Sequence, residues 1–103
     1  MPTEQFIRKK AVEKLKKKNW IFWYPAKIKF KQNDIFGVFD LICWKKKTSK
    51  IKFIQLTTKA NLSTREKKIQ KFLKKNGVPK RNFLNIEAWG WSKKEKIFKI
   101  IEI

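Results

Sequence analysis

Residues 34–58 read DIFGVFDLICWKKKTSKIKFIQLTT, and the rest of the chain is arranged around this stretch. Two apolar segments, 35–44 and 51–57, are joined by the lysine-rich segment 45–50. Their length and their content of aromatic and β-branched residues are typical of strands, so we expect two neighbouring strands connected by a turn. The first segment is apolar almost throughout, which indicates a strand covered on both faces by other parts of the fold.

Three polar side chains interrupt these apolar segments. Asp40 lies inside the first segment, and Gln55 and Thr57 are two residues apart in the second. A buried carboxylate is costly without a partner, and strand residues two apart share a face. If the strands pair in register, the three side chains meet in one polar patch at a sheet edge. The alternatives are a structural, lysine-paired or turn-capping Asp40 and solvent-facing positions for Gln55 and Thr57.

The sequence on either side predicts two helices. Residues 3–18 carry an apolar stripe at helical spacing, with Thr3 as the N-cap and Asn19 as the end. Residues 61–76 form the second helix. Its signals are a capping box between Ser63 and Glu66, Gly77 at the C-terminal cap, the stop at Pro79, and the stripe Ile69, Phe72 and Leu73.

Further strands are expected at residues 20–24, 82–91 and 97–103, with a turn at 93–95 between the last two. Residues 26–33 favour a basic loop, with a strand as the alternative, and Asn33-Asp34 favours a turn. The order helix, three strands, helix, two strands indicates an α/β arrangement in which the helices cover one shared sheet.

The composition points to one domain, residues 1–103, with an anionic partner. Nine Phe and five Trp are enough for a packed core, while 28 basic and 8 acidic residues give a net charge of +20. Nucleic acid is the first candidate, because lysine and arginine neutralise phosphates and release counterions. The alternative is that an AT-rich genome or a hot habitat enriches lysine without any such partner.

Some classes of chemistry are excluded by residues that the chain lacks. There is no histidine, so His-based acid–base catalysis, the serine triad and most zinc sites are ruled out. Cys43 is the only cysteine and is expected to be a small buried hydrophobe. No apolar run approaches the roughly 18 residues of a membrane span. We expect a soluble, cytoplasmic protein without a signal peptide.

The order of elements and the motif of Asp40 followed by Gln55-Leu56-Thr57 resemble the PD-(D/E)XK nuclease superfamily, and most of all its small Holliday junction resolvase-like members. The resemblance covers nearly the whole chain. It implies a restriction-endonuclease-like α/β fold with a central mixed sheet of four or five strands and two flanking helices, in the order helix-strand-strand-strand-helix-strand-strand.

The resemblance also implies roles for individual residues. Asp40 stands where the family has its metal-binding aspartate, Gln55 where it has a second acid, and Thr57 where it has a lysine. Gln55 and Thr57 depart from the family pattern, although an amide oxygen can still bind Mg²⁺ or Mn²⁺ beside Asp40. Lys59, two residues beyond Thr57, is the nearest source of the missing positive charge. The family often adds an acid from the first helix, for which Glu4 is better placed than Glu13.

The function implied by the resemblance is Mg²⁺- or Mn²⁺-dependent cleavage of DNA, selective for branched structures, by an enzyme whose relatives work as homodimers. Phosphate contacts are expected from Lys59, Arg65, Lys67, Lys68 and Lys71. Trp89, Trp91 and residues 20–24 can stack on bases, although core positions are the simpler interpretation. The alternatives are a catalytically inactive nuclease fold that binds DNA or RNA through its basic surface, and an RNA-binding or ribosome-associated domain.

Overall fold

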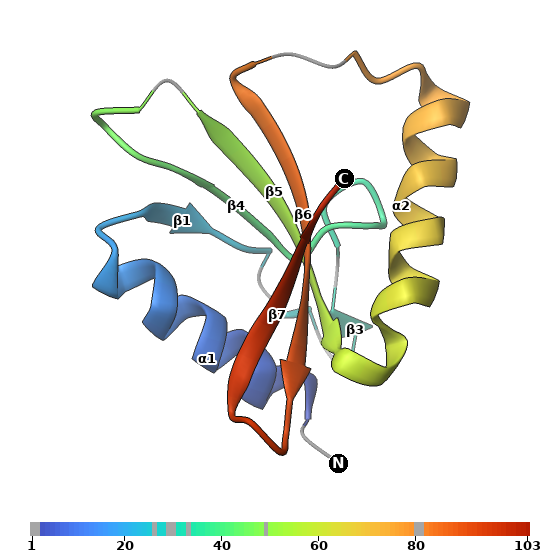
Figure 1. Ribbon diagram of the computed structural model, residues 1–103. Coiled ribbons are helices and arrows are strands. Elements are labelled where there is room, and N and C mark those ends of the chain that lie inside the picture. Colours follow the sequence, from blue (N-terminus) through green and yellow to red (C-terminus); the bar gives the residue numbers. More distant parts are fainter. Residues whose placement is uncertain (1–2, 26, 29–30, 33, 49, 80–81) are drawn as a thin grey trace.

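The computed structural model describes residues 3–25, 27–28, 31–32, 34–48, 50–79 and 82–103. Its centre is a five-stranded sheet with the strand order β1-β4-β5-β6-β7 (Figure 1). The strands of this sheet are β1 (Ile21–Trp23), β4 (Leu41–Trp44), β5 (Ile51–Thr58), β6 (Leu84–Ser92) and β7 (Ile97–Glu102). The helices are α1 (Glu4–Lys17) and α2 (Leu62–Asn76), and a 3-10 turn, η1 (Lys59–Asn61), precedes α2.

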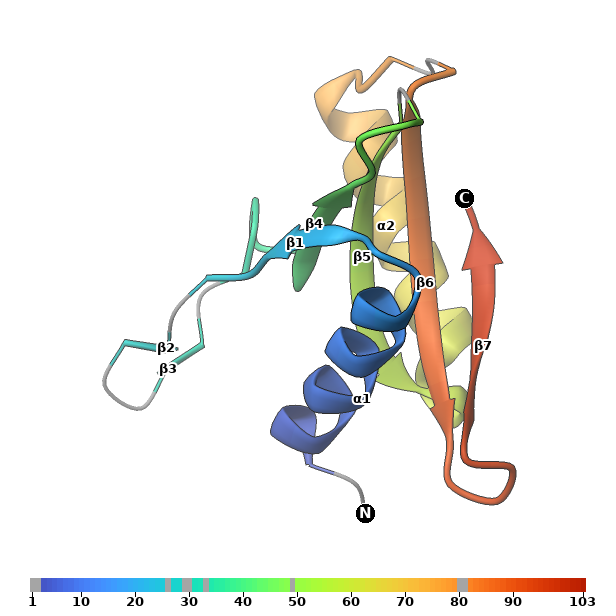
Figure 2. The ribbon, with the colours of Figure 1, turned by 90° about the vertical axis from the view of Figure 1, so that its left-hand side faces the viewer.

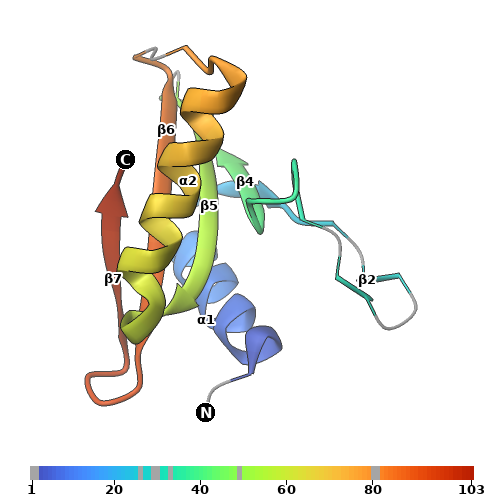
Figure 3. The same ribbon diagram turned by 90° about the vertical axis from the view of Figure 1, so that its right-hand side faces the viewer.

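The sheet is mixed, because β5 and β6 run parallel while all other neighbouring pairs are antiparallel. Helix α2 connects β5 to β6 and lies on one face of the sheet, and α1 lies on the opposite face (Figures 1 and 3). The predicted α/β class, with a mixed sheet of four or five strands and two flanking helices, is confirmed.

The layer between α1 and the sheet holds the first hydrophobic core. Ala11 and Leu15 of α1 pack with Leu41 and Cys43 of β4 and with Ile54 of β5. Burial raises the pKa of the Cys43 thiol to about 11, so this cysteine is an inert core residue, as its apolar neighbours in the sequence predict.

The layer between α2 and the sheet holds the second core. Leu62 and Ile69 of α2 pack with Ile86 and Ala88 of β6, and Phe39 joins them from the segment before β4. Alternation along β5 serves both layers at once, since Phe53 belongs to this core while Ile54 belongs to the first. The segment 34–58 therefore lies between the two helices, and its second strand, β5, is the central strand of the sheet.

The prediction of one long strand over 35–44 is wrong in its first half. Residues Ile35 and Phe39 close a tight turn through a β-bridge and reciprocal backbone hydrogen bonds of 2.7 and 2.9 Å. Phe36 (φ 56°) and Gly37 (φ 70°) adopt the left-handed conformation inside this turn. A strand cannot continue through such residues, so β4 is confined to Leu41–Trp44.

The helix boundaries agree with the prediction except at one cap. The Thr3 Oγ1 accepts a hydrogen bond from Phe6 N at 3.1 Å, and Asn19 (φ 62°) follows the end of α1. Gly77 caps α2 in the left-handed conformation. The predicted capping box between Ser63 and Glu66 is wrong, because η1 leads directly into α2 and moves the N-cap to Asn61.

The region predicted as a loop at 26–33 contains two short strands, β2 (Lys27–Ile28) and β3 (Lys31–Gln32), which pair with each other away from the main sheet (Figure 2). The loop prediction is wrong for these residues. Its remaining positions 26, 29–30 and 33, and position 49 of the turn 45–50, lie outside the described residues. Neither helix of the described chain has the length and apolar content needed to cross a bilayer.

Candidate metal centre

Asp40 lies directly before β4 and is bound to β5 by two hydrogen bonds. Its backbone N donates to Ile54 O at 2.9 Å, and its side-chain Oδ2 accepts from Leu56 N at 2.7 Å. The carboxylate thus satisfies a strand amide that β4 begins too late to reach. This bond fixes the carboxylate beside the central strand of the sheet.

Two further acids meet Asp40 at this point. One carboxylate oxygen each from Glu4, Asp34 and Asp40 lie within 4.8 Å of one another. Glu4 comes from the first turn of α1, and Asp34 comes from the start of the turn that ends at Phe39. We call these three residues the acid cluster. Glu13, the other candidate on α1, is instead 3.8 Å from Lys10 in an i, i+3 pair.

The electrostatics of the acid cluster are unfavourable without a cation. The pKa of Asp40 is raised to about 7, mainly by burial and also by the charges of Asp34 and Glu4, against the opposing effects of the Leu56 amide and Arg65. In the described part of the chain, none of the three acids forms an ion pair. Glu4 and Asp34 are exposed and Asp40 is half-buried, so water solvates the outer two carboxylates while Asp40 is the most withdrawn of the three.

Gln55 and Thr57 are buried, with 4% and 7% of their surfaces exposed. The alternative that they face solvent is therefore wrong. By strand alternation their side chains share the α2 face of β5 with Phe53. Among the described residues no hydrogen bond joins either side chain to the Asp40 carboxylate, and Gln55 Oε1 is buried there without a partner. The predicted edge location is also wrong, because β5 is the central strand.

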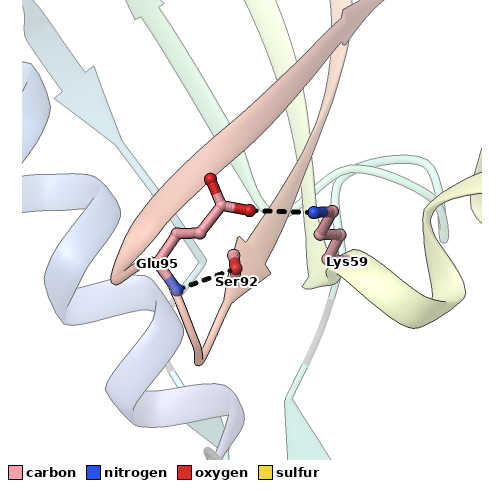
Figure 4. A network of polar contacts seen from close by, with 3 residues as sticks. All are labelled: Lys59, Ser92 and Glu95. Atoms are coloured by element: carbon pink, nitrogen blue, oxygen red, sulfur yellow. Dashed lines mark hydrogen bonds and ion pairs between the residues drawn. The ribbon is translucent and has the colours of Figure 1, made fainter.

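Lys59 is engaged elsewhere. Its Nζ lies 3.0 Å from Glu95 Oε1, on the turn between β6 and β7, and Glu95 N in turn donates to Ser92 Oγ at 3.1 Å (Figure 4). This pair is about half exposed, so it contributes little to stability and can open. In the conformation described, however, the Lys59 ammonium is directed to Glu95 and not to the acid cluster.

The basic residues predicted to contact phosphates lie on α2. Lys67, Lys68 and Lys71 are exposed, and Arg65 is half-buried and close enough to lower the pKa of Asp40. Trp89 and Trp91 are only 2% and 7% exposed, which confirms their interpretation as core residues. They cannot offer an open ring face to a base without rearrangement.

The sequence pattern did not place the Asp34 carboxylate in the site, and it did not predict that Phe36 is exposed beside it in the chain. Asp34 was interpreted as a turn residue, which is correct, because Gly37 N donates to Asp34 O at 3.2 Å. The same turn also carries its carboxylate to Asp40. Phe36, at the tip of the turn, exposes 71% of its surface. The spacing of Asp34, Gly37 and Asp40 was the available signal, since a turn between two acids brings them together.

The acid cluster offers carboxylate oxygens, which are the hard ligands that Mg²⁺ and Mn²⁺ prefer. The donor set of Glu4, Asp34 and Asp40 therefore fits a divalent cation. Comparison of the chain with protein-family models, with curated proteins and with solved structures finds no match.

Proposed function

We propose that this chain is a metal-dependent DNA endonuclease of the PD-(D/E)XK type, with a restriction-endonuclease-like fold and a preference for branched DNA. The observation that carries the proposal is the acid cluster. A strongly basic protein gathers three of its eight acids within 4.8 Å of one another, and none of the three forms an ion pair with a base among the described residues. A divalent cation would neutralise this repulsion and would lower the raised pKa of Asp40.

The arrangement of the elements supports the same proposal. In the main sheet, α1 is followed by the antiparallel strands β1, β4 and β5, and α2 then leads to β6, which is parallel to β5. This is the order that the resemblance implies, with the short β2–β3 hairpin as an addition between β1 and β4.

We assign the metal ligands to Glu4, Asp34 and Asp40, and Gln55, whose buried amide oxygen has no partner among the described residues, as a further oxygen donor. Gln55 stands where the resemblance expects an acid, and Asp34 supplies the carboxylate that this position lacks. A Mg²⁺ or Mn²⁺ ion at the cluster would polarise the scissile phosphate and activate a water molecule. The protein would contribute the position of these oxygens, which the Leu56 amide and the first turn of α1 fix.

Arg65 and the exposed lysines of α2 are the proposed contacts to the DNA backbone. Arg65 lies nearest to the acid cluster, where its charge acts on Asp40. Lys67, Lys68 and Lys71 extend the positive surface along α2. Such contacts position the duplex without reading its sequence, which suits an enzyme that recognises the structure of a junction.

The test is cleavage of a labelled four-way junction and of supercoiled plasmid with Mg²⁺ or Mn²⁺. We expect Asp40→Asn to lose activity about a hundredfold or more, since loss of a metal ligand costs at least as much as loss of its supporting residues. Asp34→Asn should lose about tenfold or more for the same reason. Glu13→Gln is the matched control on α1 and should cleave normally. Equal activity of wild type and Asp40→Asn would contradict the proposal.

The second candidate is a nuclease fold that binds nucleic acid without cutting it. It is favoured by Thr57, which is buried and uncharged where the family has a lysine, and by the engagement of Lys59 with Glu95. This candidate predicts salt-sensitive DNA binding and no product with either metal ion. The same cleavage assay, with binding measured in parallel, separates the two candidates.

A further inference from the structure

A second feature of the molecule lies on the α1 face, away from the α2 lysines. Between α1 and the β6–β7 hairpin there is a groove of about 940 Å³. Helix α1 covers the middle of the sheet and leaves the β7 side of this face open (Figure 2). None of the three acids of the cluster lines the groove, although Thr3, directly before Glu4, does.

The two walls of the groove carry the same charge. Lysines line it from the α1 side and from the hairpin side, and the one acid among the lining residues, Glu13, is paired with one of them. The six lysines are Lys10, Lys14, Lys17, Lys18, Lys93 and Lys96. Opposed walls of like charge repel each other, and an anionic chain between them would remove the repulsion.

The floor of the groove is aromatic and well packed. Phe6 contacts Trp91 edge to face, with ring centroids 5.7 Å apart, and Trp91 contacts Phe98 in the same manner at 5.0 Å. Phe6 still exposes 39% of its surface, and Ile97 beside it exposes 56%. Lys10 Nζ lies over the Phe6 ring, 5.6 Å from its centroid, so a base that stacks on that face would take the place of the Lys10 ammonium.

The abundance of lysine in the chain does not by itself produce a groove with lysines on both walls and aromatic rings on its floor. A second groove of similar size, about 860 Å³, lies beside the C-terminal end of α2. Among the described residues it is lined by Lys50 and Lys74, together with Glu102, and by no aromatic side chain. The described walls of the two grooves therefore differ most clearly in the aromatic floor, which reflects the placement of side chains and not the overall composition.

We propose that the groove between α1 and β7 binds single-stranded nucleic acid, with the phosphates on its lysines and an unpaired base on Phe6. A duplex hides the faces of its bases, so it could use the lysines but not the aromatic floor. The proposal goes beyond cleavage, because the groove contains none of the assigned metal ligands and needs no metal ion.

The experiment measures the affinity of a labelled oligo-dT and of a duplex of equal length by fluorescence anisotropy, in EDTA and at fixed salt. Lys14→Glu/Lys93→Glu reverses one charge on each wall. Lys50→Glu/Lys74→Glu is the matched control, since it makes the same charge change in the second groove and also alters one helix end. We expect the first variant to bind oligo-dT about tenfold more weakly than the control. For this variant, the slope of log affinity against log salt concentration should decrease in magnitude by about 0.7 for each lost phosphate contact.

The floor is tested separately with Phe6→Ala and Phe6→Leu. Loss of one stacked base should weaken oligo-dT binding about tenfold for both variants, with little change for the duplex. Phe6→Leu keeps apolar packing against Trp91, so it separates stacking from folding, and thermal melting of every variant checks the fold. Because the titrations contain EDTA, oligo-dT binding is measured independently of metal-dependent cleavage.

Two results would overturn the proposal. One is equal loss of oligo-dT affinity in the two lysine variants, because binding would then depend on net charge and not on the groove. The other is unchanged oligo-dT affinity in the groove variants together with weaker binding to phosphatidylserine vesicles, which would assign the groove to an anionic lipid surface.

Discussion

Glu87 is buried and Asp40 is half-buried, and the fold treats their charges in opposite ways. Glu87 in β6 is 5% exposed, and its Oε2 lies 3.1 Å from Lys52 Nζ. Its Oε1 accepts a hydrogen bond from Trp89 Nε1 at 2.9 Å. Both oxygens of this carboxylate therefore have a side-chain partner. Lys52 Nζ also lies over the ring of Trp20, 4.7 Å from its centroid.

The Asp40 carboxylate lies beside one backbone amide and two other acids. The Leu56 N–H satisfies one of its oxygens, while Asp34 and Glu4 raise its pKa. Glu87 has the environment of a structural acid, whose charge is balanced by a base. Asp40 has no such ion pair among the described residues, and we propose that a bound cation balances its charge.

The largest effect on stability should come from matched isosteric changes at these two acids. Glu87→Gln leaves Lys52 without its carboxylate in a mostly buried position and should lower the free energy of unfolding by about 3 kcal/mol. Asp40→Asn keeps an oxygen for the Leu56 amide and removes a repelled charge, so without metal at pH 8 it should be as stable as wild type or more so. Urea unfolding measures both. A loss in Asp40→Asn as large as in Glu87→Gln would erase the distinction.

The next effect is the pH dependence of stability. The native pKa of Asp40 is about 7, above the ordinary value of 3.8, so the native state holds a proton that the unfolded chain has released. The contribution of Asp40 to stability is therefore largest at low pH and is lost as the pH rises through 7, by about 2.5 kcal/mol between pH 5 and pH 8. No histidine titrates in this window.

Asp40→Asn should remove this slope, and Mn²⁺ should recover the lost stability at pH 8 much more than at pH 5, because the cation competes with the proton. Thermal unfolding across pH, with Mn²⁺ or with EDTA, measures both effects. An unchanged slope in Asp40→Asn would show that another group causes it.

The smallest effect concerns the cap that positions Glu4. Thr3→Ala removes the side-chain bond to Phe6 N and should cost about 1 kcal/mol of stability. It should also weaken Mn²⁺ binding severalfold, because Glu4 lies in the first turn that this cap orders. Ser63→Ala is the control at the start of α2, where no side-chain cap bond exists, and should change stability by less than about 0.5 kcal/mol. Equal effects would contradict the assigned caps.

The periodic parts of the fold were predictable from the sequence. Alternation over 51–57 predicts β5, which extends one residue further to Thr58. The stripe Ile7, Ala11 and Leu15 predicts the buried face of α1, and Gly77 predicts the end of α2. These features depend on local spacing, which the sequence states directly.

The composition of the acid cluster was less predictable, because it depends on contacts that are distant in the sequence. Asp40 and Glu4 were expected, but the turn from Ile35 to Phe39 is hidden within an apolar run that also fits a strand. If that run were a strand, its extended backbone would hold the Asp34 and Asp40 carboxylates far apart in space. Only the closed turn, with Phe36 in the left-handed conformation, brings the two carboxylates together.

The central claim is that the acid cluster holds a divalent cation, and the most direct measurement is the anomalous difference density of a crystal soaked in Mn²⁺. The proposal predicts a peak among the carboxylates of Glu4, Asp34 and Asp40 in wild type, and its loss in Asp40→Asn. A wild-type map without a peak between these three carboxylates, although the side chains lie as described, would contradict it.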